Sequence, residues 1–252
     1  AHLGTFGERE EVSRIAALCA RELAACGIFM NLAPVADVST KPPSPAMEDR
    51  CFGTDPELAG QLASIWVSES QACGVASCLK HFPGHGSATG DSHLCLPQVD
   101  KPLEELMEQD VRPFADALAA RPAAVMSAHV VYPCLDPEVP ATLSRTIITG
   151  LLREKLNFGG LVITDDLEMA AISQRWEVAE AAIAAVEAGA DVILVARQLR
   201  NTSLVQMHEA LMRAVECGRL TEERINASVL RILAVKDRYA GPPVRQGLNI
   251  EY

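Results

Sequence analysis

Helical segments and short, almost wholly apolar segments alternate along the chain, and this alternation limits the folds that it can adopt. The apolar segments contain runs such as AAVM, LVIT and VILVA. A strand that is apolar on both faces is typical of a parallel sheet covered by helices, because each parallel connection carries a helix across the sheet. The pattern predicts strands at residues 28–35, 76–82, 123–129, 161–164 and 191–196.

The segments between these strands have apolar residues at helical spacing. They predict helices at residues 8–26, 55–72, 103–119, 144–156, 176–187, 203–217 and 221–238. The order indicates an α/β fold of the (β/α)8 TIM-barrel type, which usually takes about 250 residues. The 252 residues contain only five predicted strands, so we expect a partial barrel. The predicted domain covers residues 1–240 and is incomplete at its N-terminus, and residues 241–252 are predicted to form an irregular tail.

Charge and composition exclude several classes of function. The chain has 22 Lys and Arg against 33 Asp and Glu, a net charge of −11, which disfavours binding to nucleic acid or to an anionic membrane surface. The chain contains no run of 18 apolar residues, which is about the length needed to span a bilayer, and residues 1–11 do not resemble an export signal. The eight cysteines form no CxxC pair, so we expect reduced thiols and a cytoplasmic location instead of a disulfide or zinc framework.

Ionisable side chains gather just after four successive predicted strands. The carboxyl ends of parallel strands meet at one edge of the sheet, which is where α/β proteins build their sites. Independent structural roles would scatter such residues over both ends, so the convergence predicts a functional site. The residues are Asp37 and Arg50 after the first strand, Lys80, His81, His85, Asp91 and His93 around the end of the second, His129 after the third, and Asp165 and Asp166 after the fourth.

Each of these residues also has an alternative interpretation. A single histidine at a strand end is more often structural than catalytic, and a pair of aspartates after a strand often caps a helix. The glycine-rich stretch contains no GxxxxGK[ST] motif, so it does not predict a phosphate site. Histidines 81, 85, 93 and 129 could instead bind a metal. Against a metal, Asp91 lies two residues from His93, and a carboxylate beside an imidazole gives a ring that exchanges protons near neutral pH.

Three motifs together give a specific family resemblance. The stretch KHFPGHG followed by DSH, the segment MSAHVVYP and the segment TDDLEM resemble glycoside hydrolase family 3, in the branch of bacterial β-N-acetylhexosaminidases. The earlier segments APVADV and DRCFGTDPEL also resemble that family, and the similarity covers about residues 8–240. The spacing between GHG and DSH is the discriminating element, because relatives that act on plain β-glucosides usually lack the Asp-His pair.

The resemblance implies roles for particular residues. Asp165 would be the nucleophile that attacks the anomeric carbon, His93 the general acid/base and Asp91 its partner. These roles agree with a retaining mechanism, in which a carboxylate forms a glycosyl-enzyme ester that water then hydrolyses. No metal and no cofactor is implied. The residues implied to hydrogen-bond the sugar hydroxyls are Arg50, Lys80 and His81.

Three further expectations concern the neighbours of these residues. We expect Lys80 to help hold the pKa of Asp165 low, because the nucleophile must stay ionised. Asp166 receives no chemical role and is expected to cap the helix that follows. His129 is expected to be a structural or substrate-contacting group near the site.

The resemblance also implies a substrate, and it implies that part of the barrel is missing from this chain. The expected substrate is a saccharide that contains N-acetylglucosamine, such as a muropeptide derived from peptidoglycan. Family members begin with three further strands, the last of which carries an IDQEGGRV-like segment, and nothing like it occurs here. The chain therefore resembles a truncated barrel, and we expect its open sheet edges to promote self-association. Two alternatives stay open, an inactive sugar-binding or interaction remnant and a metal-dependent barrel hydrolase.

Overall fold

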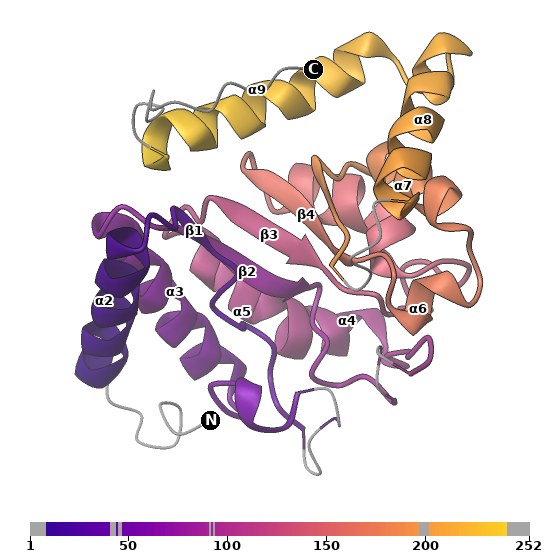
Figure 1. Cartoon of the computed structure of the whole chain (residues 1–252). Helices are drawn as coiled ribbons and strands as arrows, with labels where there is room; N and C mark the ends of the chain where they lie inside the picture. The colour runs from indigo at the N-terminus through magenta and orange to yellow at the C-terminus, as the bar shows by residue number, and fades with distance from the viewer. Residues whose placement is uncertain are drawn as a thin grey trace.

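Five parallel strands form the sheet of this protein (Figure 1). The computed structural model describes residues 9–40, 44, 47–90, 92, 94–196 and 202–240. The strands lie in the order β1-β2-β3-β4-β5, so each lies beside the next one in the sequence. The sheet curls into part of a barrel, which confirms the predicted α/β fold of the TIM-barrel type. The strands are β1 Met30–Asn31, β2 Ala76–Phe82, β3 Ala124–Ser127, β4 Leu161–Asp166 and β5 Val192–Leu194.

Helices connect the strands, and local sequence signals explain where some of them begin. The carboxylate of Asp55 accepts hydrogen bonds from the backbone N–H groups of Glu57 and Leu58, and a proline follows it at the first helical position. The hydroxyl of Thr221 caps the last helix in the same way. The helices are α2 Arg9–Ala25, α3 Pro56–Ala72, α4 Leu103–Leu106, α5 Arg112–Leu118, α6 Ala170–Ser173, α7 Val178–Ala188, α8 Thr202–Glu216 and α9 Glu222–Tyr239, with 3₁₀ turns η1 Glu48–Arg50 and η3 Ala141–Leu143 and π-helical segments η2 Met107–Val111 and η4 Thr146–Lys155.

The two faces of the sheet are covered differently. On the convex face, α3 packs between α2 and α5, and the main core lies between these helices and the strands (Figure 1). On the concave face, Ile232 and Val235 of α9 pack against a smaller apolar cluster that includes Cys78, Met126 and Ile163. The helix α9 thus covers part of the face that would line the interior of a barrel.

A buried carboxylate fastens α9 to the sheet. The side chain of Asp191, which precedes β5, accepts hydrogen bonds from Ser228 and Arg231 of α9 at 2.7 and 3.1 Å. It also accepts from Arg153 of η4 and from the backbone N–H of Val162 at 2.5 and 2.9 Å. One side chain without exposed surface therefore joins α9, η4 and β4.

The structure corrects several predicted boundaries. The first strand spans only two residues, in part because Pro34 has no N–H group to donate to the neighbouring strand. The predicted helix at 103–119 is divided into α4, η2 and α5, the one predicted at 144–156 is largely the π-helical η4, and α6 was not predicted. The fourth strand is longer than predicted and contains both Asp165 and Asp166. The predicted tail at 241–252 lies outside the described residues.

Candidate active site

Four of the six predicted site residues meet at the carboxyl ends of the strands. Lys80 and His81 come from the end of β2, Asp165 comes from the end of β4, and Arg50 comes from η1 in the loop after β1. All four line one pocket of about 130 Å³. The other two predicted residues, Asp91 and His93, lie outside the described residues, but Ser92 between them also lines this pocket.

The alternation of side chains along a strand explains why Lys80 and Asp165 point into the same pocket. Successive residues of a strand point to opposite faces of the sheet. In β4, Ile163 belongs to the cluster on the concave face, so Asp165 two residues later points to the same side. In β2, Cys78 belongs to that cluster and Lys80 follows it by two residues. The pocket therefore lies on the concave face of the sheet, at the end where the polar residues Lys80 and Asp165 follow the apolar cluster.

Asp165 lies where a carboxylate can stay ionised. Its side chain retains 21 % exposure, and its Oδ1 accepts the backbone N–H of Asp166 at 2.8 Å. Burial by itself would raise the pKa of Asp165, but the electrostatic influence of the nearby His81 and His129 side chains and this hydrogen bond outweigh burial and leave the pKa below its ordinary value. The predicted influence of Lys80 acts in the same direction but is smaller than that of His81.

A second carboxylate, that of Asp37, lies beneath the pocket and holds His81. Asp37 has no exposed surface, and its Oδ2 accepts the Nδ1–H of His81 at 2.8 Å. The backbone N–H groups of His81 and His85 also donate to Asp37. Burial favours a raised pKa for Asp37, but His81 and the hydrogen bonds leave the pKa below its ordinary value. The opposite nitrogen of His81, Nε2, points towards Asp165 and lies 3.9 Å from its Oδ2.

The two adjacent aspartates have different surroundings in the structure. The Oδ1 of Asp166 accepts the backbone N–H groups of Glu168 and Ala196, so its carboxylate closes the turn after β4 and supports the end of β5. This is a structural role, although the residue before α6 is Met169 and Asp166 does not cap that helix directly.

His129 supports the same turn and is structural. It is 1 % exposed, its Nε2 donates to the carbonyl oxygen of Asp166 at 3.0 Å, and its Nδ1 lies 2.8 Å from the hydroxyl of Thr142. Burial lowers the pKa of His129, so the ring is neutral near pH 7.

Two cations stand near the pocket. The side chain of Lys80 is partly buried, and burial together with the neighbouring charge of Arg50 lowers the pKa of Lys80. Arg50 itself is exposed at the edge of the site. Such cations can donate to hydroxyl groups of a ligand, and the Nε2 of His81, whose Nδ1 bonds to Asp37, can also hydrogen-bond to one; Asp165 can accept or attack. The sequence did not indicate the apolar side of the pocket, which is formed by Leu32, Met47, Met126 and Leu194.

The loop after β2 is fixed by close packing. A Cβ atom on Gly86 would lie 1.8 Å from the carbonyl oxygen of Val38, so only glycine fits at this position. Beside it, the hydroxyl of Ser87 and the ammonium of Lys101 both donate to the buried Asp110 at 2.6 Å. The loop that carries His85 is thus held from both sides.

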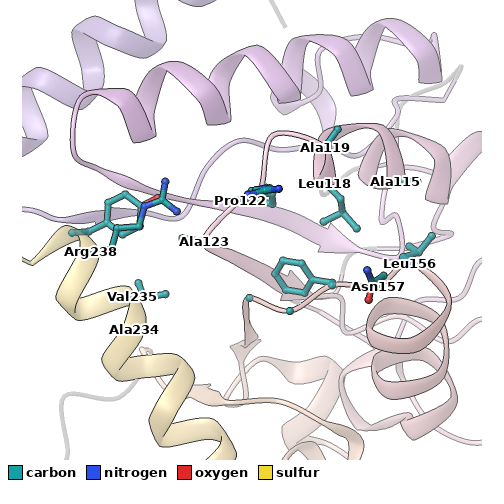
Figure 2. Close-up of a pocket in the computed structure, with 15 residues that line it drawn as sticks. Ala115, Leu118, Ala119, Pro122, Ala123, Leu156, Asn157, Ala234, Val235 and Arg238 are labelled. Carbon is teal, nitrogen blue, oxygen red and sulfur yellow. The ribbon is translucent and has the colours of Figure 1, made fainter.

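A larger cavity lies at the opposite end of the sheet (Figure 2). It has a volume of about 680 Å³ and lies where β3 and β4 begin, next to α9. Its lining is mainly apolar and contains no carboxylate or histidine; Arg238 is at its edge. It therefore lacks the groups that hydrolysis of a glycosidic bond requires.

Among the residues that the structure describes, no group of three or more His, Cys, Asp or Glu side chains is arranged to hold a metal ion. No described helix is both long enough and apolar enough to cross a membrane.

Comparisons with known proteins point to one family. The N-terminal domain of glycosyl hydrolase family 3 matches residues 2–235. "Beta-hexosaminidase A" of Pseudoalteromonas piscicida is 36 % identical over 242 residues, which cover 90 % of this chain and 40 % of that protein. "Beta-hexosaminidase" of Idiomarina loihiensis is 35 % identical over 229 residues, covering 90 % of this chain and 67 % of that protein.

A solved structure from the same family has the same overall fold. The family 3 β-N-acetylglucosaminidase of Paenibacillus sp. str. FPU-7 superimposes with a TM-score of 0.92 at 44 % identity, over 98 % of this chain and 47 % of that protein. The chain thus spans about half the length of that structure and less than half of the P. piscicida protein.

Proposed function

Because the chain belongs to glycoside hydrolase family 3, we propose that it carries the active site of a retaining β-N-acetylglucosaminidase. The proposed substrates carry a terminal non-reducing N-acetyl-β-hexosamine. The observation that supports this most is the placement of Asp165, an ionised carboxylate that retains exposure and shares one pocket with Lys80, His81 and Arg50. A carboxylate among hydroxyl-binding groups is the arrangement that attack on a sugar requires.

In the first step of the proposed reaction, Asp165 attacks the anomeric carbon. The bond from that carbon to the leaving oxygen breaks, and a glycosyl ester of Asp165 forms. The leaving oxygen takes a proton from His93, which we assign as general acid with Asp91 as its partner. The hydrogen bonds and charges that lower the pKa of Asp165 keep it ready for this attack at neutral pH.

In the second step, water resolves the ester. The neutral ring of His93 takes a proton from the water, and the resulting hydroxide attacks the anomeric carbon and releases Asp165. Two inversions at one carbon leave its configuration unchanged, so the product is the β-anomer. Lys80, His81 and Arg50 hold the sugar hydroxyls throughout both steps.

The proposal also includes the source of the substrate and the location of the protein. We propose a cytoplasmic enzyme that acts on muropeptides, fragments of peptidoglycan that contain N-acetylglucosamine. The eight cysteines are all free thiols, which agrees with a reducing compartment. The expected absence of a metal and a cofactor is part of the same proposal.

The test is hydrolysis of 4-nitrophenyl N-acetyl-β-glucosaminide by the purified protein. We expect turnover that EDTA does not change, and none in the Asp165→Asn variant, because an amide cannot form the ester. The matched control is Asp166→Asn, which keeps the neighbouring carboxylate and should retain most of the activity if folded. Activity in Asp165→Asn with none in a folded Asp166→Asn would show that the other aspartate is the nucleophile.

The alternatives give different results in the same assay. Hydrolysis that EDTA abolishes would favour the metal-dependent hydrolase. Binding of N-acetylglucosamine without hydrolysis by the wild-type protein would favour the non-catalytic remnant. A third measurement tests His93, because its replacement by alanine should slow substrates with poor leaving groups more than those with acidic ones.

A further inference from the structure

Ser92 lies between the two residues of the proposed acid/base pair and is itself buried. Its exposed fraction is 2 %, although Leu94 two residues later is 72 % exposed. The Oγ of Ser92 lies 3.0 Å from the Nε2 of His85, which is also only 2 % exposed. The carbonyl oxygen of Ser92 accepts the backbone N–H of Ala171 in α6 at 3.2 Å. Ser92 is therefore tied to the end of β2 and to the segment that follows Asp165.

The hydrogen bonds of His85 define which atom donates. Its Nδ1 is buried and has no partner among the described residues. A buried N–H group without an acceptor is rarely tolerated, so the ring proton belongs on Nε2, and this N–H donates to Ser92. Burial and the charge of His81 lower the pKa of His85 to about 4, which keeps the ring neutral at pH 7.

The position of His85 is in turn set by the floor of the site. Its backbone N–H donates to Asp37 at 2.6 Å, the same carboxylate that holds His81. The next residue, Gly86, packs against the backbone of Val38. A continuous set of buried contacts thus runs from His81 through Asp37 and His85 to Ser92.

We propose that His85 and Ser92 are positioning residues, whose buried hydrogen bond fixes the chain between Asp91 and His93 relative to the nucleophile Asp165. This inference rests on the proposed function, because it assigns Asp91 and His93 to the acid/base role. Adjacent Cα atoms are about 3.8 Å apart, so a fixed Ser92 restricts the positions that both neighbours can take. Misplacement of a reacting group by about 1 Å can reduce a rate about 100-fold.

The test compares substitutions that differ only in whether they keep the hydrogen bond. Ser92→Ala removes the acceptor, and His85→Asn removes a donor at the Nε2 position. His85→Gln is the conservative variant, since its amide nitrogen can reach about the same place and donate to Ser92. Ser68→Ala, at an exposed position in α3, is the matched control for loss of a serine hydroxyl.

The first readout is kinetic and uses phenyl and 4-nitrophenyl N-acetyl-β-glucosaminides. For Ser92→Ala and His85→Asn we expect kcat on the phenyl substrate, which needs protonation most, to fall about 100-fold. We expect the fall on the 4-nitrophenyl substrate to be several times smaller, with KM for both nearly unchanged. His85→Gln and Ser68→Ala should behave like the wild type.

The second readout is independent of activity. Hydrogen–deuterium exchange of the amides in residues 87–96 should be faster in Ser92→Ala and His85→Asn than in His85→Gln or the wild type. Unchanged exchange, or an equal fall in kcat on both substrates, would overturn the positioning role. A wild-type protein that hydrolyses neither substrate would refute the proposed function and with it the catalytic part of this inference, while exchange would still decide whether the bond anchors the loop.

Discussion

The buried His85 should make the protein sensitive to acid in a defined range of pH. In the folded protein its pKa is about 4, because burial and the charge of His81, whose ring centroid is 5.8 Å away, outweigh the opposing effects of Asp37 and Asp165. In the unfolded chain the value returns to about 6.5. Between these values the unfolded state binds a proton that the folded state does not bind.

The sign and size of the effect follow from this difference. The free energy of unfolding falls as the pH falls from about 6.5 towards 4, and the contribution is fully present above 6.5. Through His85 alone, the free energy of unfolding at pH 4.5 is about 2.5 kcal/mol lower than at neutral pH. This figure follows from the two pKa values, about 4 in the folded and about 6.5 in the unfolded state, at about 1.4 kcal/mol per pH unit. His129, whose pKa is also lowered by burial, acts in the same direction.

A comparison of the wild type with His85→Gln isolates the contribution of His85. Glutamine does not titrate, and the contributions of His129 and of the carboxylates are common to both proteins. Urea unfolding followed by the fluorescence of Trp66 and Trp176 at pH 7.0, 6.0, 5.0 and 4.5 gives both free energies. We expect the wild type to lose about 2.5 kcal/mol more than the variant over this range. Parallel pH profiles would refute the reasoning.

Three other predictions concern packing, charge and assembly. Gly86→Ala should leave little soluble protein or lower the melting temperature by more than 10 °C, as measured by circular dichroism, because its Cβ would overlap the carbonyl of Val38. Asp191→Ala should cost about 3–5 kcal/mol in urea unfolding, since it leaves partly buried arginines without their carboxylate, while Asp191→Asn should cost less. The double substitution Leu230→Glu and Leu233→Glu should reduce self-association in light scattering without lowering the melting temperature, because both side chains are more than half exposed and give α9 an apolar surface in addition to the open sheet edges. A wild-type protein that is already monomeric would contradict the last prediction and the expected self-association.

The order of strands and the site at their carboxyl ends could be predicted because both follow from periodic signals. The apolar runs place the strands, and the position of Asp165 two residues after the inward-facing Ile163 follows from the alternation within a strand. The extent of β1 could be predicted only in part, because Pro34 is visible in the sequence but the pairing of Met30 and Asn31 with β2 is not.

The supporting residues of the site were harder to recognise. In the sequence Asp37 is recognisable only as a polar residue after a strand, and nothing marks Ser92 between Asp91 and His93. Their hydrogen bonds join residues 44 and 7 positions apart, and no local pattern reports such contacts. His81 lowers the pKa of Asp165 more than Lys80 does. This order depends on distances between side chains, which the spacing of residues along the sequence does not give.

The cavity in Figure 2 has a consequence for how this protein can change. It lies at the amino ends of the strands, the end of an α/β barrel that contributes stability, whereas the pocket with Asp165 lies at the other end. Larger side chains at Ala115 or Ala234, which line this cavity, would add apolar contacts without approaching the reacting groups. Thermal tolerance and the lining of the pocket with Asp165 can therefore evolve on separate parts of the same sheet, and a gain in one need not be a loss in the other.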